Sequence, residues 1–146
     1  MIFPIGDENV IGGAKPYVSY TLITLNILIF IYTLSIGNEI GNFYRAYATI
    51  PAQLMDGYGF MTLLTNMFLH GGLMHIAGNM LFLWIFSDNV EAIFGNFWFF
   101  LFYLAGGIFA TLAHVAFNQT SIIPSLGASG ALSAVMGAYL VFFPKS

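Results

Sequence analysis

A few polar side chains interrupt apolar stretches of this chain and could carry chemistry. Ser129 lies in the run Gly127-Ala128-Ser129-Gly130, and His75 and Asn79 stand four residues apart in another apolar stretch. A serine hydroxyl is a nucleophile only when a base activates it. Taken alone, a serine at a helix start is most often an N-cap, and an asparagine in an apolar helix most often joins helices. Chemistry therefore depends on the elements that bring these residues together.

Charged residues are rare in this chain and unevenly spaced. Of the 146 residues, 59% are hydrophobic and only 6% are charged, against about 25% charged residues in a soluble domain. No Asp, Glu, Lys or Arg occurs in residues 17–37, 58–86 or 93–143. Each of these stretches can hold a spanning helix, which needs about 20 apolar residues. The sequence therefore predicts an all-α, polytopic membrane helix bundle.

The pattern predicts about four transmembrane helices within a single membrane domain, residues 1–146. Residues 37–72 combine Arg45, Pro51 and Asp56 with several aromatic residues, which is typical of an interfacial loop holding short amphipathic helices. The four helices are expected over residues 17–36, 73–90, 97–117 and 129–144.

Several function classes are excluded. The net charge of −3 arises from three basic and six acidic residues with no basic patch, so we expect no nucleic-acid partner. The chain has no cysteine, and His70 and His75 are not the His-Glu-x-x-His pair of a metalloprotease. We expect neither a metal nor a cofactor. The context of Ser129 also fails the Gly-x-Ser-x-Gly pattern of α/β-hydrolases.

Helix rise places the polar residues at one depth. Ser129 lies 16 residues before Lys145, which is about 24 Å along an upright helix. His75 lies 16 residues before Glu91. Because the hydrocarbon core is about 30 Å thick, both side chains should lie several ångströms below the outer face.

His75 and Asn79 fall on one helix face because residues four apart stack. Polar groups facing lipid are costly, so this face should turn toward protein or a water-filled cavity. Near Ser129, Gly127 permits unusual backbone angles and Gly130 allows another helix to approach closely.

These motifs together resemble the rhomboid family of intramembrane serine proteases. The resemblance extends from Tyr17 through Pro144. It is carried by His70-Gly71-Gly72, by His75 and Asn79, and by Gly127-Ala128-Ser129-Gly130.

The resemblance implies a role for each matching position. Ser129 would be the nucleophile, and its backbone amide would stabilise the tetrahedral oxyanion together with His75 and Asn79. His70, Gly127 and Gly130 would support this site.

Two departures from the family pattern affect the expected activity. The family's first loop commonly carries a Trp-Arg pair, whereas Tyr44 precedes Arg45 here. The family's general base is a histidine on the sixth core helix, and this chain ends after the fourth. We therefore expect a chain truncated after its fourth helix and inactive alone. His114 should lie near the outer boundary as an interfacial or packing histidine.

The predicted function is an intramembrane serine endopeptidase that cleaves transmembrane or juxtamembrane segments of membrane proteins. Its partners would be the lipid bilayer and a transmembrane protein substrate; the sequence does not determine an oligomeric state. Lys15 and Lys145 flank one side and Arg45 the other. The positive-inside rule then predicts a cytoplasmic N-terminus. We expect a multi-pass protein of a prokaryotic cytoplasmic membrane.

Two alternatives remain open at this stage. A non-catalytic rhomboid-like protein would bind transmembrane helices without cutting them. A transporter or channel fragment would line a pathway with its intramembrane His and Asn residues. A channel needs a continuous pore, whereas a protease needs a cavity closed toward the cytoplasm.

Overall fold

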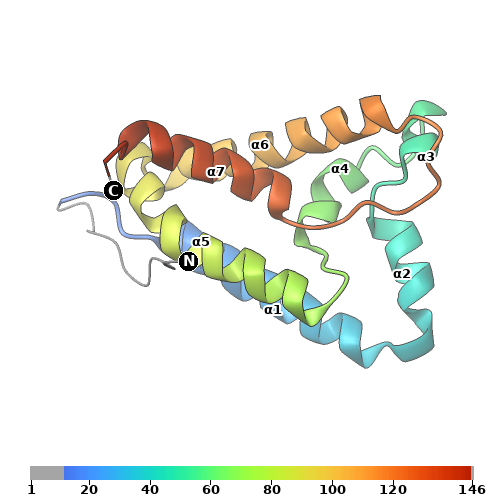
Figure 1. Cartoon of the computed structure of the whole chain (residues 1–146). Helices are drawn as coiled ribbons and strands as arrows, with labels where there is room; N and C mark the ends of the chain where they lie inside the picture. The colour runs from blue at the N-terminus through green and yellow to red at the C-terminus, as the bar shows by residue number, and fades with distance from the viewer. Residues whose placement is uncertain (1–11, 146) are drawn as a thin grey trace.

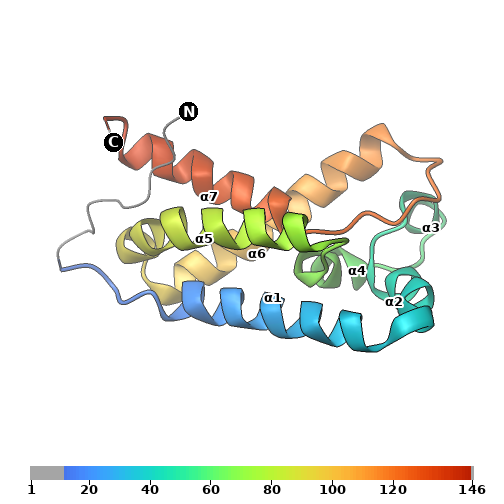
Figure 2. The ribbon, with the colours of Figure 1, turned by 60° about the horizontal axis from the view of Figure 1, so that its bottom comes forward.

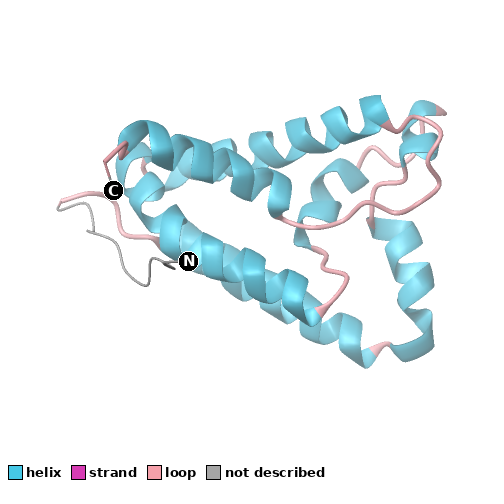
Figure 3. Ribbon diagram, viewed as in Figure 1, coloured by secondary structure: helices cyan, strands magenta, loops and turns pink. Residues whose placement is uncertain are grey.

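The structure, a computed structural model, describes residues 12–145, in which helices are joined by loops (Figures 1 and 3). Within this range there are no strands, and the only β-type pairing is an isolated antiparallel bridge between Thr49 and Ser125. The elements are α1 (Tyr17–Ser35), η1 (Gly37–Glu39), α2 (Ile40–Tyr47), α3 (Pro51–Met55), α4 (Thr62–Thr65), η2 (Asn66–Phe68), α5 (Leu73–Phe94), α6 (Asn96–Phe117) and α7 (Ser129–Phe142).

Four long helices, α1, α5, α6 and α7, form the bundle, which confirms the predicted all-α fold. In Figure 2, α1 and α5 run side by side, and α7 packs against both α5 and α6. Helices α1 and α6 are each long and apolar enough to cross a membrane. Helix α5 meets that criterion only together with Thr62–Phe68, from which it is bent by 92°, and α7 has only 14 residues. By length and composition there are thus two or three candidate spans, fewer than the four expected.

Local backbone chemistry decides where two helices end. Helix α5 continues to Phe94, past the expected end at residue 90, and stops at Gly95, whose φ of +79° is a left-handed value. Glycine adopts such angles without steric cost, so it is a common helix terminator. Helix α7 ends at Phe142 rather than at residue 144. Pro144 disfavours helical angles at the residue before it, which explains the earlier end.

The segment between α1 and α5 forms short helices, and its last part, η2, packs into the bundle. Met67 is only 1% exposed, and its side chain fills the space that a Cβ on Gly107 of α6 would occupy. Because Gly107 has no side chain, η2 can enter the bundle beside α6. Because η2 packs against α6, the last part of this segment belongs to the bundle, and the interfacial position of residues 37–72 stays a prediction.

Small residues let α6 and α7 approach closely. A Cβ placed on Gly106 would lie 2.6 Å from the Cβ of Ala134, and one placed on Gly130 would lie 2.6 Å from the Cβ of Ala110. Larger side chains would separate the helices, so this contact fixes their relative position. Around it, the apolar core includes the fully buried Tyr103.

Glu91 joins α5 to the start of α1 inside the protein. Its side chain is 0% exposed, and its carboxylate accepts hydrogen bonds from the amides of Val18 and Ser19 at 2.9 and 2.8 Å. The Ser19 hydroxyl and the side-chain amide of Asn96 also donate to this carboxylate. The carboxylate thus satisfies amides that a helix N-terminus leaves free. Glu91 is not the solvent-facing charge that the depth argument assumed.

The first residues of α1 and the last residues of α7 lie at one end of the bundle, and α2 lies at the other (Figure 1). The Asn96 side chain donates to the backbone carbonyl of Lys15 at this first end. Lys15 and the end of α7 are therefore separated from Arg45 by the length of the bundle, as the charge pattern requires.

Candidate active site

Ser129 is the first residue of α7, which begins beside α6 at a point before the end of α6. Residues 118–128 run back from α6, past α3 and α4, to the start of α7 (Figure 1). Gly130 contacts Ala110, which lies seven residues before Phe117, the last residue of α6. Measured along α6, Ser129 therefore lies about 10 Å from that helix end, toward the middle of the bundle. The chain therefore carries this serine into the bundle.

The Ser129 side chain does not cap its helix. The N-cap residue is Ala128, and no side chain makes a capping hydrogen bond there. Ser129 is exposed, and within residues 12–145 its hydroxyl has no hydrogen-bond partner. The common explanation of a serine at this position, helix capping, is therefore wrong here.

Gly127 brings His75 and Ser129 to the same point. Its φ is +126°, and a Cβ built on it would lie 2.8 and 2.9 Å from Cε1 and Nε2 of the His75 ring. The same position is 3.9 Å from the Ser129 Oγ. The imidazole and the hydroxyl therefore adjoin one glycine, although they come from α5 and α7.

Asn79 lies on the same α5 face but contacts a different histidine. Its side chain is 8% exposed, and its Nδ2 is 3.0 Å from Nε2 of His70, which is 1% exposed. An amide nitrogen only donates, so Asn79 donates this hydrogen bond and Nε2 of His70 accepts it. The rings of His70 and His75 are 5.2 Å apart. The buried His70 therefore orients Asn79, while His75 remains exposed toward Ser129.

Other candidate groups lie outside this cluster. His114 is exposed near the end of α6, and Nδ2 of Asn118 lies 3.5 Å from its Nδ1. In the part of the chain that the structure describes, no group of three or more His, Cys, Asp or Glu residues could hold a metal ion.

Two contacts of the site were not apparent from the sequence. The Gly127 amide donates to the backbone carbonyl of Asn66 at 2.9 Å, and the Tyr44 hydroxyl donates to the backbone carbonyl of His70 at 2.9 Å. Burial raises the pKa of Tyr44, against the opposing effect of a hydrogen bond with Thr33, so the phenol remains a donor at neutral pH. Tyr44 lies in α2 and Gly127 in the segment before α7, and the local sequence of neither carries a signal for such a long-range contact.

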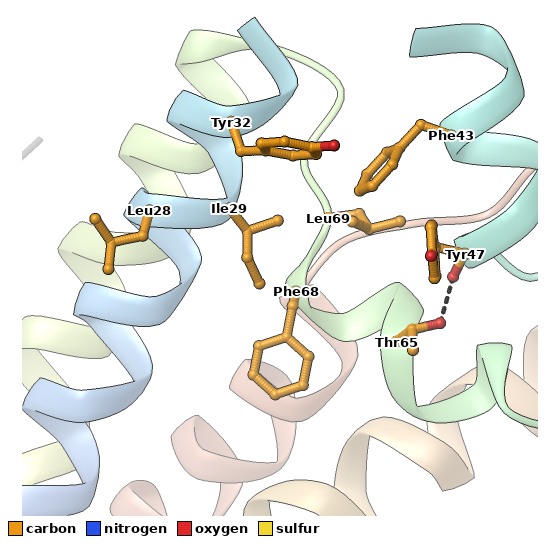
Figure 4. Close-up of a pocket in the computed structure, with 8 residues that line it drawn as sticks. All are labelled: Leu28, Ile29, Tyr32, Phe43, Tyr47, Thr65, Phe68 and Leu69. Atoms are coloured by element: carbon orange, nitrogen blue, oxygen red, sulfur yellow. Dashed lines mark hydrogen bonds between the residues drawn. The ribbon is translucent and has the colours of Figure 1, made fainter. Parts of the chain in front are cut away.

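An apolar pocket of about 410 Å³ opens between α1, α2 and the α4–η2 segment (Figure 4), and Ser129 is not among the residues that line it. At its edge the Thr65 hydroxyl donates to the backbone carbonyl of Tyr47. The residues around it are Leu28, Ile29, Tyr32, Phe43, Tyr47, Thr65, Phe68 and Leu69.

Comparison with known protein families agrees with this arrangement. The model of the rhomboid domain matches residues 58–146, which include both motifs of the site. This chain belongs to the rhomboid family. Its apolar helices and this membership make it an integral membrane protein.

Curated rhomboid relatives include bacterial and mitochondrial proteins. Rhomboid protease GluP of Bacillus subtilis is 36% identical over 135 residues, which cover 92% of this chain and 26% of the relative. RHOMBOID-like protein 6, mitochondrial, of Arabidopsis thaliana is 42% identical over 60% of this chain and 28% of its own length. Presenilin-associated rhomboid-like protein A, mitochondrial, of Danio rerio is 31% identical over 59% of this chain and 23% of its own length. The chain thus spans about a quarter of the length of these relatives.

Proposed function

We propose that this chain is the nucleophile-bearing part of an intramembrane serine endopeptidase, with Ser129 attacking the scissile carbonyl of its substrate. The observation that supports this most directly is the meeting of the Ser129 hydroxyl and the His75 ring at Gly127. The family membership and the similarity to a bacterial rhomboid protease support the same chemistry.

In this proposal, His75, Asn79 and the Ser129 amide stabilise the oxyanion. A nitrogen donor fixed before the reaction is worth more in a water-poor site than in water, and losing one costs about 10²- to 10³-fold in rate. Asn79 donates one of its two amide hydrogens to His70, and the second is the one proposed for the oxyanion. His75 is close enough to Gly127 that a carbonyl placed beside Ser129 would meet its ring.

The general base is proposed to lie outside these 146 residues. The chain contains three histidines. His70 accepts from Asn79, His75 has the oxyanion role, and His114 pairs with Asn118 instead of Ser129. A serine without a base reacts slowly, so we expect the 146 residues alone to be inactive and the whole protein to supply this group.

The proposed substrate is a transmembrane or juxtamembrane segment of another membrane protein. An intact helix keeps its carbonyls hydrogen-bonded, so the segment must unwind to present one to Ser129. We also propose that the N-terminus is cytoplasmic, on the basis of the lysines at one end of the bundle and Arg45 at the other. The relatives include bacterial and mitochondrial proteins, so they do not distinguish a prokaryotic membrane from a mitochondrial one.

Labelling with a fluorophosphonate probe tests the proposal. The whole protein and the 146-residue chain, both purified in detergent and shown to be folded, are treated with the probe and mapped by peptide mass spectrometry. We expect the whole protein to be labelled at Ser129 and the 146-residue chain to react far more slowly. A folded whole protein without label at Ser129 would contradict the proposal and favour a rhomboid-like protein that binds transmembrane helices without cleaving them.

A further inference from the structure

A buried polar cluster lies between the first loop and α6. Thr49, Asn66 and Thr111 are 0%, 2% and 8% exposed, and we call them the anchor cluster. Asn66 Nδ2 lies 3.0 Å from the Thr49 hydroxyl and 3.4 Å from the Thr111 hydroxyl. Both Asn66 Nδ2 and the Thr49 hydroxyl donate to the Thr62 carbonyl, at 2.6 and 2.9 Å. The cluster therefore links the loop, η2 and α6 through side-chain hydrogen bonds.

The backbone of this cluster holds the segment that leads to Ser129. Thr49 and Ser125 exchange two hydrogen bonds: the Thr49 amide donates at 3.0 Å and the Ser125 amide at 2.7 Å. Two residues later, the Gly127 amide donates to the Asn66 carbonyl at 2.9 Å. The segment is thus fixed twice just before the nucleophile, in each case to a residue whose side chain belongs to the anchor cluster.

Gly127 is held between two different partners. Asn66 accepts its amide hydrogen, and the His75 ring occupies the space beside its Cα. A displacement of Asn66 would therefore move Gly127 relative to His75. Because Ser129 is two residues further along, its hydroxyl would move as well.

The chemical nature of the cluster suits positioning. Burying amides and hydroxyls is costly without hydrogen bonds, and apolar side chains of similar size would fill the space without that cost. Hydrogen bonds have narrow distance and angle ranges. A satisfied polar network therefore specifies one arrangement more sharply than apolar packing does.

We propose that Thr49 and Asn66 are positioning residues that hold the Gly127–Ser129 turn in register with His75. This inference rests on the proposed role of Ser129 as nucleophile. Neither side chain contacts Ser129, His75 or Asn79; both act through the backbone that they fix.

The test compares Thr49→Val, Asn66→Leu and Thr49→Ser in the whole protein. Valine matches threonine in shape but has no hydroxyl, leucine is close to asparagine in size but cannot donate, and serine keeps the hydroxyl. At saturating fluorophosphonate, we expect the limiting rate of Ser129 labelling to fall about 10- to 100-fold in the first two variants. The half-saturating probe concentration should not change, and Thr49→Ser should label within about twofold of wild type.

Hydrogen–deuterium exchange provides a second readout that does not depend on catalysis. We expect the peptide covering residues 121–128 to exchange faster in Thr49→Val and Asn66→Leu, with α6 protected as in wild type. Thr49→Ser should exchange like wild type. If Asn66→Leu does not fold, Thr49→Val still carries both measurements, since it removes only a hydroxyl.

The outcomes separate this inference from the proposed function. Absence of wild-type labelling at Ser129 would reject the nucleophile, while the exchange measurement would still show whether the cluster anchors the turn. Normal labelling in wild type and an unchanged limiting rate per folded molecule in both variants would overturn the positioning role. A lower thermal midpoint with an unchanged limiting rate would give the cluster only a structural role, and would also overturn it.

Discussion

Replacing Gly127 with alanine should impair the site in two separable ways. The new Cβ would lie 2.8 and 2.9 Å from ring atoms of His75, too close for unaltered packing. The φ of +126° is also a conformation that residues with a Cβ rarely adopt. The substitution therefore strains the backbone and displaces His75 or the turn that carries Ser129.

The magnitudes follow from these two effects. Holding a non-glycine residue in a sparsely populated backbone region costs about 1–3 kcal/mol, so the free energy of unfolding should fall by about that amount. If His75 leaves its place beside Gly127, the oxyanion loses one donor, which costs about 10²- to 10³-fold in rate. We expect Gly127→Ala to fold with reduced stability and to label at Ser129 at least about 100-fold more slowly.

Two glycines provide matched controls. Gly57 has a φ of +87° with no atom within 4 Å of a new Cβ, so Gly57→Ala has the backbone strain without the clash. Gly137 of α7 is also open but has no left-handed angle. There, alanine should stabilise the helix by about 0.5–1 kcal/mol. Neither control should slow labelling per folded molecule.

The assay measures labelling of Ser129 and the thermal midpoint on the same detergent-solubilised whole-protein samples. Among the three variants, only Gly127→Ala should show a fall in labelling rate that is larger than the loss of folded protein accounts for. The reasoning is refuted if Gly127→Ala is labelled at the wild-type rate. It is equally refuted if Gly57→Ala loses labelling to the same extent, because strain alone would then explain the effect.

Three further predictions use other parts of the structure. Ser129→Ala should abolish cleavage of a transmembrane substrate with an unchanged thermal midpoint, since its hydroxyl makes no hydrogen bond within residues 12–145; residual cleavage would remove Ser129 from the mechanism. Asn79→Ala should lower kcat by about 10²- to 10³-fold with little change in KM, and steady-state cleavage kinetics showing an unaltered kcat would argue against an oxyanion role. Glu91→Gln places an NH₂ group against the donors of Val18 and Ser19 and should lower the free energy of unfolding by about 1–3 kcal/mol, measured by denaturant titration in detergent; equal stability would mean that these bonds contribute little.

The helices could be predicted from the spacing of charges because the membrane imposes a simple physical rule. An apolar stretch in lipid must satisfy its own backbone hydrogen bonds, and a helix does so locally. Residues 17–35 and 96–117 therefore form helices close to the expected positions. The entry of η2 into the bundle was missed because it depends on Met67 meeting Gly107, two residues that are distant in the chain.

The candidate site was only partly predictable for the same reason. The spacing of His75 and Asn79 placed both on one face of α5, and Gly130 predicted that another helix would approach α7 closely. The pairing of Asn79 with His70 and the bond from Gly127 to Asn66 were not predictable. A hydrogen bond between distant segments depends on separations that helical periodicity does not specify.

Composition, charge spacing and short motifs predicted a membrane helix bundle of the rhomboid family, because these signals are contained in the order of the residues. Which side chains meet depends instead on how the helices pack in the folded chain. Glu91 is buried against the start of α1, although a charged residue near a helix end is usually expected to face solvent. Asn79 and His75 of α5 also have different neighbours: Asn79 contacts His70, while the His75 ring lies beside Gly127, near Ser129. The physical reason is that packing of α7 on α6 sets the depth of Ser129, and packing is a property of surfaces that come together only in the folded chain.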